Sequence, residues 1–367
     1  MEKNNKNLNV PNLRFPEFSG EWEIHRLGEL VEIKSGVSPT GIIDENGLFP
    51  FYKVEQLNNC YVELNETPYL TMQSSVPVHS IIFPKRGAAI MTNKIRIASK
   101  PCQLDTNLMA LIIENNEKVD YKFLFYFIAR YNLSKIADTS TIPQINNIHI
   151  NPLKITLPSI KEQQKISALL TVLDLKIDTQ RKIIEKYESL IRGLCEQLTR
   201  QGTKNKAINE CLDCHTSTLQ ESSVSGTGEY PVYGATGVCG YTNFNDVKDD
   251  GILIIKDGAS VGTTYYARGS YSHIGTLNRL TARKGVNLRY VYYCLKVMNF
   301  APYKTGLAIP HIYFKDYGKH RIWCPSYEEQ LQIANILTQI DDKIHVEKSL
   351  LEQLNSQKRY MLNQLFI

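Results

Sequence analysis

Two stretches of the sequence decide the fold: residues 142–178 read IPQINNIHINPLKITLPSIKEQQKISALLTVLDLKID, and residues 309–345 read IPHIYFKDYGKHRIWCPSYEEQLQIANILTQIDDKIH. They align without a gap at an offset of 167 residues, and the alignment continues to the carboxyl terminus. Chance does not explain a match of this length, so the segment occurs twice. The paired residues include Pro143 with Pro310, Pro158 with Pro325, Glu162 with Glu329, Gln163 with Gln330 and Asp174 with Asp341.

The repeat extends upstream through the rest of the chain. LGELVEIKSG from Leu27 matches INECLDCHTS from Ile208, and GLFPFY from Gly47 matches GEYPVY from Gly228, both at an offset of 181 residues. SIIFPKRGA, residues 80–88, then matches GILIIKDGA, residues 251–259, at an offset of 171. The falling offsets indicate deletions in the second copy. A repeat of this length indicates a tandem duplication of the whole 367-residue chain.

Each copy ends in a segment whose apolar residues alternate at spacings of four and three, which is typical of a coiled-coil helix. Proline, serine and an early glutamate precede each segment, as at many helix starts. Gln180, Glu347 and Lys358 interrupt the two seams. Two matched seams in one chain predict an antiparallel coiled coil; the alternative is that each helix packs on its own domain. The predicted seam residues are Ile166, Leu170, Leu173, Ile177 and Ile184, with Ile333, Leu337, Ile340, Ile344 and Leu351.

The parts before the helices combine short β-rich runs with one aromatic helix each, so we expect mixed α/β domains. The predicted fold class is therefore α+β: two mixed α/β domains joined by two long helices, related by a pseudo-two-fold duplication. The expected organisation is an amino-terminal arm (1–20), a first domain (21–155), a central helix (156–203), a second domain (204–322) and a carboxy-terminal helix (323–367).

Positive charge is concentrated in two stretches, residues 67–104 and 258–315, which contain no Asp or Glu. Lysine and arginine interleaved with tyrosine suit a phosphate backbone and base edges. The alternative is a solvated basic face above core tyrosines. Lys256 lies just before the second stretch, and we include it among the candidates because the repeat aligns it with Lys85; each of the two lysines lies two residues before Gly-Ala. The candidate DNA-binding residues are Lys85, Arg86, Lys94, Arg96, Lys256, Arg268, Arg279, Arg283 and Lys304.

The pentapeptide CLDCH, residues 211–215, has the spacing of a c-type haem attachment site. The repeat, however, places Cys211 and Cys214 opposite Leu30 and Ile33, so we interpret both cysteines as small core residues. A zinc site would need a second ligand pair, and none is seen. Motifs for methyl transfer, hydrolysis or nucleotide binding are also missing. We expect a non-catalytic, cytoplasmic protein without metal, cofactor or membrane segment.

Four stretches carry a resemblance to a known family: PNLRFPEFSGEWEIHRLGEL (11–30), YPVYGATGVCGY (230–241), LPSIKEQQKISALLTVLDLKID (157–178) and CPSYEEQLQIANILTQIDDKIH (324–345). Together they resemble the DNA specificity subunit of type I restriction–modification systems, and the likeness covers essentially the whole chain. The resemblance implies two target recognition domains, each reading one half of a bipartite site in double-stranded DNA. The helices would set the spacing and dock two modification subunits, which use S-adenosylmethionine; two restriction subunits would add ATP- and Mg²⁺-dependent translocation and cleavage. The alternative is a free-standing DNA-binding regulator with duplicated domains.

Overall fold

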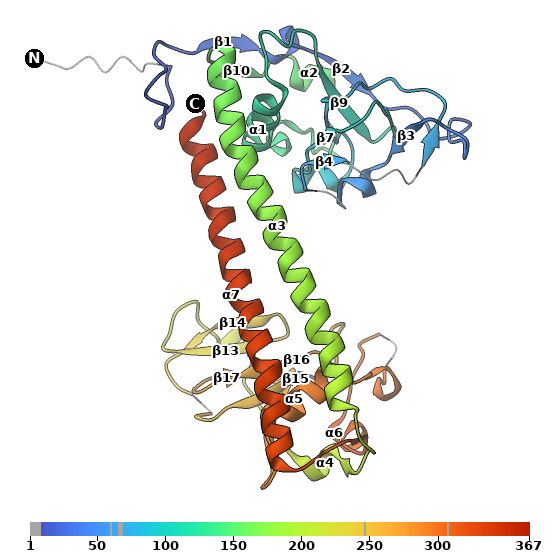
Figure 1. The fold of residues 1–367 in the computed structure, drawn as a ribbon, viewed down its shortest axis with the longest axis vertical. Helices are drawn as coiled ribbons and strands as arrows, with labels where there is room; N and C mark the ends of the chain where they lie inside the picture. Colours follow the sequence, from blue (N-terminus) through green and yellow to red (C-terminus); the bar gives the residue numbers. More distant parts are fainter. Residues whose placement is uncertain (1–8, 59–60, 65–68, 246, 307) are drawn as a thin grey trace, which may run out of the picture. The chain divides into compact units, whose positions relative to one another are not determined.

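The computed structural model describes residues 9–58, 61–64, 69–245, 247–306 and 308–367, so the expected amino-terminal arm is described only from residue 9 (Figure 1). The chain forms two compact units. Unit 1 comprises Met1–Arg181 and Leu350–Ile367, and unit 2 comprises Lys182–Ser349. Each unit therefore combines one copy of the duplicated α/β domain with segments of both long helices.

The α/β part of unit 1 consists of short strands and helices: β1 (Glu23–Arg26), β2 (Val31–Ser35), β3 (Phe49–Tyr52), β4 (Glu63–Leu64), β5 (Leu70–Thr71), β6 (Ile81–Pro84), β7 (Arg96–Ala98), β8 (Gln103–Leu104), β9 (Leu108–Ile113), α1 (Tyr121–Tyr131), α2 (Asn147–Ile150) and β10 (Lys154–Leu157). One sheet has the order β2-β9-β6-β7-β4 and a second has the order β5-β3-β8. β1 and β10 pair antiparallel, so the start and the end of the domain lie together.

The α/β part of unit 2 repeats this plan with β11 (Lys206–Ala207), α4 (Ile208–Cys211), β12 (Leu212–Thr216), β13 (Tyr230–Gly234), β14 (Gly237–Thr242), β15 (Gly251–Ile255), β16 (Thr264–Ala267), β17 (Ser272–His273), β18 (Leu277–Ala282), α5 (Leu288–Lys296), α6 (Phe314–Tyr317) and β19 (Arg321–Ile322). Its sheets have the orders β12-β18-β15-β16 and β14-β13-β17, and β11 pairs with β19.

The two domains share most of their topology, and β4 at the end of the five-stranded order of unit 1 has no counterpart in the order β12-β18-β15-β16 of unit 2. β2-β9-β6 corresponds to β12-β18-β15, all antiparallel. The parallel pair β3 and β8 corresponds to the parallel pair β13 and β17. Gln163 and Gln330 join each domain to its long helix in the same way, since each side-chain amide oxygen accepts the backbone N–H of the residue that caps α1 or α5. The duplication and the mixed α/β composition predicted from the sequence are confirmed.

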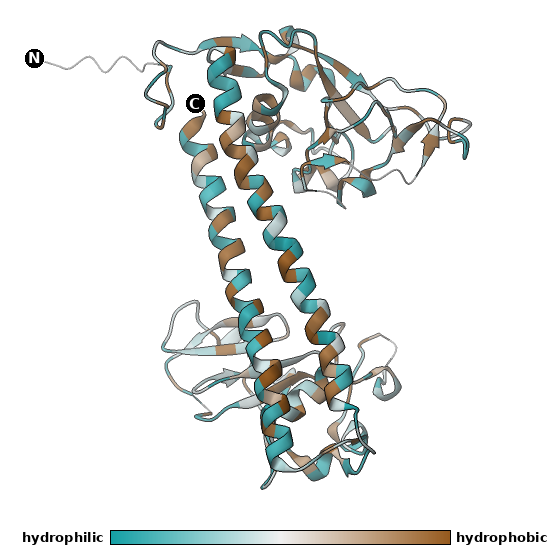
Figure 2. Ribbon diagram, in the orientation of Figure 1, coloured by the Kyte–Doolittle hydropathy of each residue, from teal (hydrophilic) through white to brown (hydrophobic). Residues whose placement is uncertain are grey.

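The long helices are α3 (Ile160–Thr199) and α7 (Tyr327–Leu365). Both begin after the predicted proline and serine. Ser326 and Glu329 form reciprocal hydrogen bonds across the first turn of α7, and the Ser159 hydroxyl accepts the N–H of Glu162 at 3.4 Å in α3. Hydrophilic and hydrophobic residues alternate along both helices (Figure 2), as expected for helices that bury one stripe.

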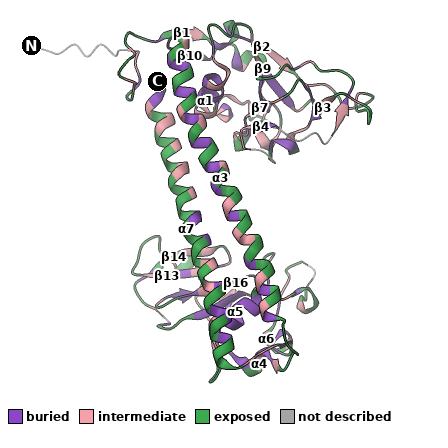
Figure 3. Ribbon diagram, in the orientation of Figure 1, coloured by how far each residue is buried: buried purple, intermediate pink, exposed green. Residues whose placement is uncertain are grey.

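In each unit the amino-terminal part of one long helix packs beside the carboxy-terminal part of the other, so the helices are antiparallel there. In unit 1, α3 and the end of α7 share a core with α1; in unit 2, the end of α3 and the start of α7 share a core with α5. The helices thus pack on each other and on their domains. Buried, half-buried and exposed residues are interspersed along both helices (Figure 3). Among the predicted seam residues, Ile340 and Leu351 are half-buried, and the others are buried: Ile166, Leu170, Leu173, Ile177, Ile184, Ile333, Leu337 and Ile344.

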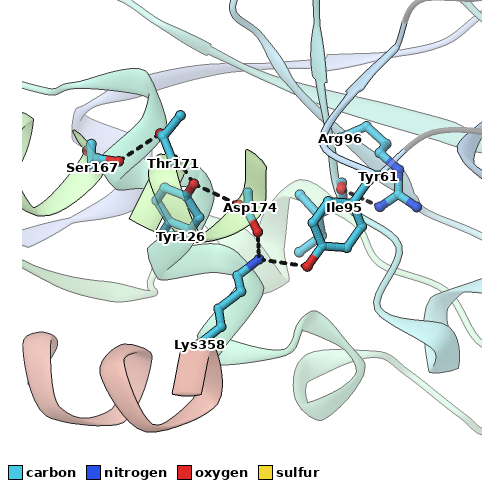
Figure 4. Close-up of polar contacts among 8 residues, drawn as sticks. All are labelled: Tyr61, Ile95, Arg96, Tyr126, Ser167, Thr171, Asp174 and Lys358. Carbon is cyan, nitrogen blue, oxygen red and sulfur yellow. Dashed lines mark hydrogen bonds and ion pairs between the residues drawn. The ribbon is translucent and has the colours of Figure 1, made fainter. Parts of the chain in front are cut away.

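Lys358, which interrupts the seam of α7, has a polar partner in unit 1 (Figure 4). Its ammonium nitrogen lies 2.5 Å from a carboxylate oxygen of Asp174, which is 4% exposed. The Tyr126 hydroxyl donates to the other carboxylate oxygen at 2.7 Å. Burial, and then the neighbouring carboxylate, raise the pKa of Tyr126, so its hydroxyl stays a donor. The polar seam position is therefore part of a satisfied buried network.

The cysteines of CLDCH lie where the repeat predicted. Cys211 is buried in the main core of unit 2, and Cys214 packs against that core. Burial raises the pKa of Cys214 to about 11, so this thiol is protonated at neutral pH. The interpretation of both as core residues is confirmed. None of the helices in the described part of the chain combines the length and apolar character needed to cross a membrane.

Candidate nucleic-acid interface

Lys85 and Lys256, paired by the repeat, occupy equivalent places in the two domains. Each follows a core strand directly, β6 in unit 1 and β15 in unit 2. The backbone N–H of Lys85 donates to Asn107 at 2.8 Å, and that of Lys256 donates to Thr276 at 3.0 Å. Both side chains are half-buried, and neither ammonium group has a hydrogen-bond or ion-pair partner among the described residues. Both are therefore fixed at the backbone and available to an anion.

The other candidates in unit 1 surround the connection from β6 to β7. Arg86 is exposed at its start. Lys94, at its end, donates to the Asn58 side chain. Arg96 lies on β7, where Nη1 donates to the carbonyl oxygen of Ile95 at 2.7 Å (Figure 4). The connection thus carries three of the four predicted cations of this domain and β7 begins with the fourth, but Lys94 and Arg96 already contact protein groups.

Three arginines of unit 2 have partners within their own unit. Arg268 pairs with Asp342 of α7 at 3.0 Å, and Arg283 pairs with Asp213 at 2.8 Å. Nε of Arg279 donates to the Tyr271 hydroxyl at 3.1 Å.

Lys304, in contrast, is exposed and has no side-chain hydrogen bond or ion pair within the described ranges. It directly precedes Thr305, the first residue of a loop that approaches Lys256. The structure therefore brings Lys304 and Lys256 into one region. Each of the three arginines, in contrast, has a protein partner of its own.

Sequence reasoning missed residues that approach the two lysines from a second loop. Arg86 forms an isolated antiparallel bridge with Gln144, and Asp257 forms the equivalent bridge with His311. Nδ1 of His311 lies 2.7 Å from Oδ1 of Asp257. The sequence repeat could have identified these residues. It aligns Ile-Pro-Gln with Ile-Pro-His and Lys-Arg-Gly-Ala with Lys-Asp-Gly-Ala, so the residues that differ between the copies lie beside residues that are identical.

No cluster of three or more His, Cys, Asp or Glu residues that could hold a metal ion occurs among the residues with described positions. The candidate residues are cations, one side-chain amide and one imidazole–carboxylate pair, which are types of group that can bind phosphates and base edges.

The duplicated fold, with cations at equivalent places, defines a two-domain protein suited to nucleic acid. The family described as type I restriction modification DNA specificity domain matches the chain twice, at residues 19–189 and 203–356, and the chain belongs to this family. The boundaries of the two matches follow the duplication.

Curated relatives and solved structures agree with this assignment. The chain is 23% identical to the putative type I restriction enzyme MjaX specificity subunit of Methanocaldococcus jannaschii, covering 98% of this chain and 96% of that protein. It is also 23% identical to the MjaVIII specificity subunit of the same organism, over 96% and 93% of the two chains. The S subunit of a type I restriction–modification system from M. genitalium has the same fold, with a TM-score of 0.70 at 18% identity over 98% of this chain and 99% of that one. The predicted family and fold class are confirmed.

Proposed function

We propose that the chain is the sequence-specific DNA-binding subunit of a type I restriction–modification enzyme. Each α/β domain reads one half of a bipartite site in double-stranded DNA. The observation that carries the proposal is the pair of domains with one topology and different side chains at equivalent surface positions, in a chain of this family. Two domains of the same fold meet duplex DNA in equivalent ways, and their different side chains read different half-sites.

The partners follow from the same assignment. Two modification subunits supply methyl transfer from S-adenosylmethionine, and two restriction subunits supply ATP- and Mg²⁺-dependent translocation and cleavage. The complex acts in the cytoplasm. The long helices set the spacing between the half-sites and carry docking surfaces for the modification subunits. The candidate cations of both domains contact phosphates or bases. Lys85, Arg86, Lys256 and Lys304 are the strongest candidates, because their side-chain charges have no partner among the residues that the structure describes.

Reconstitution tests the proposal. The purified chain with DNA and S-adenosylmethionine should transfer no methyl groups; addition of the modification subunit should produce methylation at one bipartite sequence, mapped by methylation-sensitive sequencing. Methyl transfer by the chain alone would contradict the proposal. Tight binding to a bipartite site without recruitment of a modification subunit would favour a free-standing regulator instead.

A further inference from the structure

The two loops that meet at Lys85 have a duplicate at Lys256. We call each meeting of loops a loop junction: junction 1 comprises residues 85–87 and 138–145, and junction 2 comprises residues 256–258 and, apart from residue 307, 305–312. In junction 1 the Gly87 N–H donates to Pro143 at 2.8 Å and the Ile145 N–H donates to Lys85 at 2.8 Å. In junction 2 the corresponding bonds run from Gly258 to Pro310 and from Ile312 to Lys256, both 2.9 Å.

The longer loop of each junction is closed by a second pair of backbone hydrogen bonds. Asp138 and Gln144 exchange two such bonds, both 2.9 Å, and Thr305 and His311 exchange two of 2.9 and 2.7 Å. Gly87 and Gly258 both have positive φ, 87° and 101°, so the chain leaves each junction through the same glycine-dependent turn. The backbone hydrogen bonds are therefore equivalent in both junctions, whereas the backbone angles differ at one place: Gly306 has a positive φ of 85°, and Thr139 at the equivalent place does not have a positive φ.

Two side chains are shared, and they suit contacts that do not depend on sequence. The lysine before the bridge is present in both junctions. An isoleucine is also present in both junctions, directly before the loop proline: Ile142 is 51% exposed and Ile309 is 58% exposed. An exposed large aliphatic side chain at the same loop position in both copies suits contact with the sugars of duplex DNA, and the neighbouring lysine, without a partner among the described residues, suits a phosphate.

The central pair differs completely between the junctions. Junction 1 contains Arg86 and Gln144. An arginine side chain can form two hydrogen bonds with guanine, and a glutamine side chain can form two with adenine. Junction 2 presents Asp257 and His311. A carboxylate 2.7 Å from Nδ1 favours the tautomer protonated there, which leaves His311 Nε2 and the second carboxylate oxygen of Asp257 as acceptors. Two acceptors suit the exocyclic amino groups of cytosine or adenine.

We propose that the loop junctions are where each domain reads bases, with the central pair as the specificity-determining residues and the lysine and isoleucine as the shared contacts. This inference rests on the proposed function, because it requires that the two domains bind half-sites. It goes further in naming Arg86 with Gln144, and Asp257 with His311, as the residues that make the half-sites different.

The test exchanges the central pairs in the full chain assembled with its modification subunit. One variant carries Asp257→Arg with His311→Gln, and the reciprocal variant carries Arg86→Asp with Gln144→His. Methylation-sensitive sequencing should show that each variant changes its own half-site at one or two adjacent base pairs, with a preference shift of roughly tenfold or more. The other half-site and the gap should stay as in the wild type.

A charge control and two conservative variants keep the result interpretable. Asp249→Arg changes an exposed acid before β15, whereas Asp257 follows that strand, and it should leave the half-site unchanged. If an exchange variant fails to fold or assemble, Gln144→Ala and His311→Ala decide, since both should relax discrimination at one position. Wild-type base preference in folded, active variants overturns the inference. A wild-type complex that marks no bipartite sequence overturns the proposed function instead.

Discussion

Asp174 in unit 1 and Asp341 in unit 2 occupy equivalent positions of the repeat, but they bind different partners. Asp174 is buried, with Lys358 of α7 at 2.5 Å. Asp341 is half-buried, with Lys296 of α5 at 2.9 Å. In unit 1 the carboxylate therefore joins the two long helices to each other, and in unit 2 it joins one long helix to its own domain.

The counterpart of Lys358 in the first copy is Ile191, which is buried in the core of unit 2. Ile191 lines a pocket with Lys296 and Asp341, so a cation at that place would face a carboxylate that already has one. An isoleucine beside Asp174 would leave the buried carboxylate without its cation. One polar position can specify how coiled-coil helices pair. A duplicated chain can therefore distinguish its two halves through a single seam position. Lys358 suits the buried carboxylate of unit 1, and Ile191 suits the apolar core of unit 2.

The largest effect is expected from breaking the match between the helices. Because α3 and α7 both belong to both units, four residues inserted after Gln180 alone would lengthen only α3, by about 6 Å. The apolar seam of α3 could then pack against the seam of α7 in one unit but would be out of register with it in the other unit. We expect loss of cooperative unfolding in chemical denaturation, and the same result for an insertion after Glu347 alone.

Insertions at both places should restore folding, because the two helices grow equally and keep an approximate stutter register. In the assembled enzyme, the gap between half-sites should then grow by one or two base pairs of about 3.4 Å each, with the half-site bases unchanged. Altered bases at a constant gap would show that the helices are not the spacer.

A smaller effect should separate the two units directly. Lys358→Ala leaves a buried carboxylate without its cation, so we expect a loss of about 3 kcal/mol in the free energy of unfolding, measured in urea. Lys296→Ala breaks the more exposed pair of unit 2 and should cost at most about 1 kcal/mol. A double variant with Asp174→Asn and Lys358→Met should recover part of the loss. Equal losses for the two lysine variants would mean that the units are anchored alike.

The sequence predicted the duplication, the helix starts and the core role of Cys211, because each depends on local pattern or on the repeat. The partners of the cations could not be predicted. The stretch 258–315 contains no acid, yet Arg268 and Arg283 pair with Asp342 and Asp213, which lie outside it in sequence. An acid-free run excludes only local partners; folding brings carboxylates from other elements.

The partner of Lys358 shows the same limit in another form. The heptad pattern marked this lysine as an interruption of the seam, and only the antiparallel packing in unit 1 reveals that Asp174 of α3 lies opposite. Gln144 and His311, by contrast, were within reach of the sequence, because the repeat already aligned them. Comparison of the two copies residue by residue is therefore the observation that points to the proposed specificity-determining residues.

The smallest expected effect concerns the two shared lysines of the junctions. Lys85 and Lys256 have the same backbone anchors, so we expect each to neutralise one phosphate in its own half-site. Replacement of either by alanine should weaken binding to all DNA sequences alike and reduce the slope of log K against log salt by about one unit, because one fewer counterion is released. Lys118→Ala removes an exposed lysine that lies before α1 rather than in a junction, and it should leave the slope unchanged. If the two junctions are equivalent, the two slopes should fall equally and the double variant should lose about two units. A fall for Lys85 alone would mean that the shared backbone does not give the two domains the same approach to DNA.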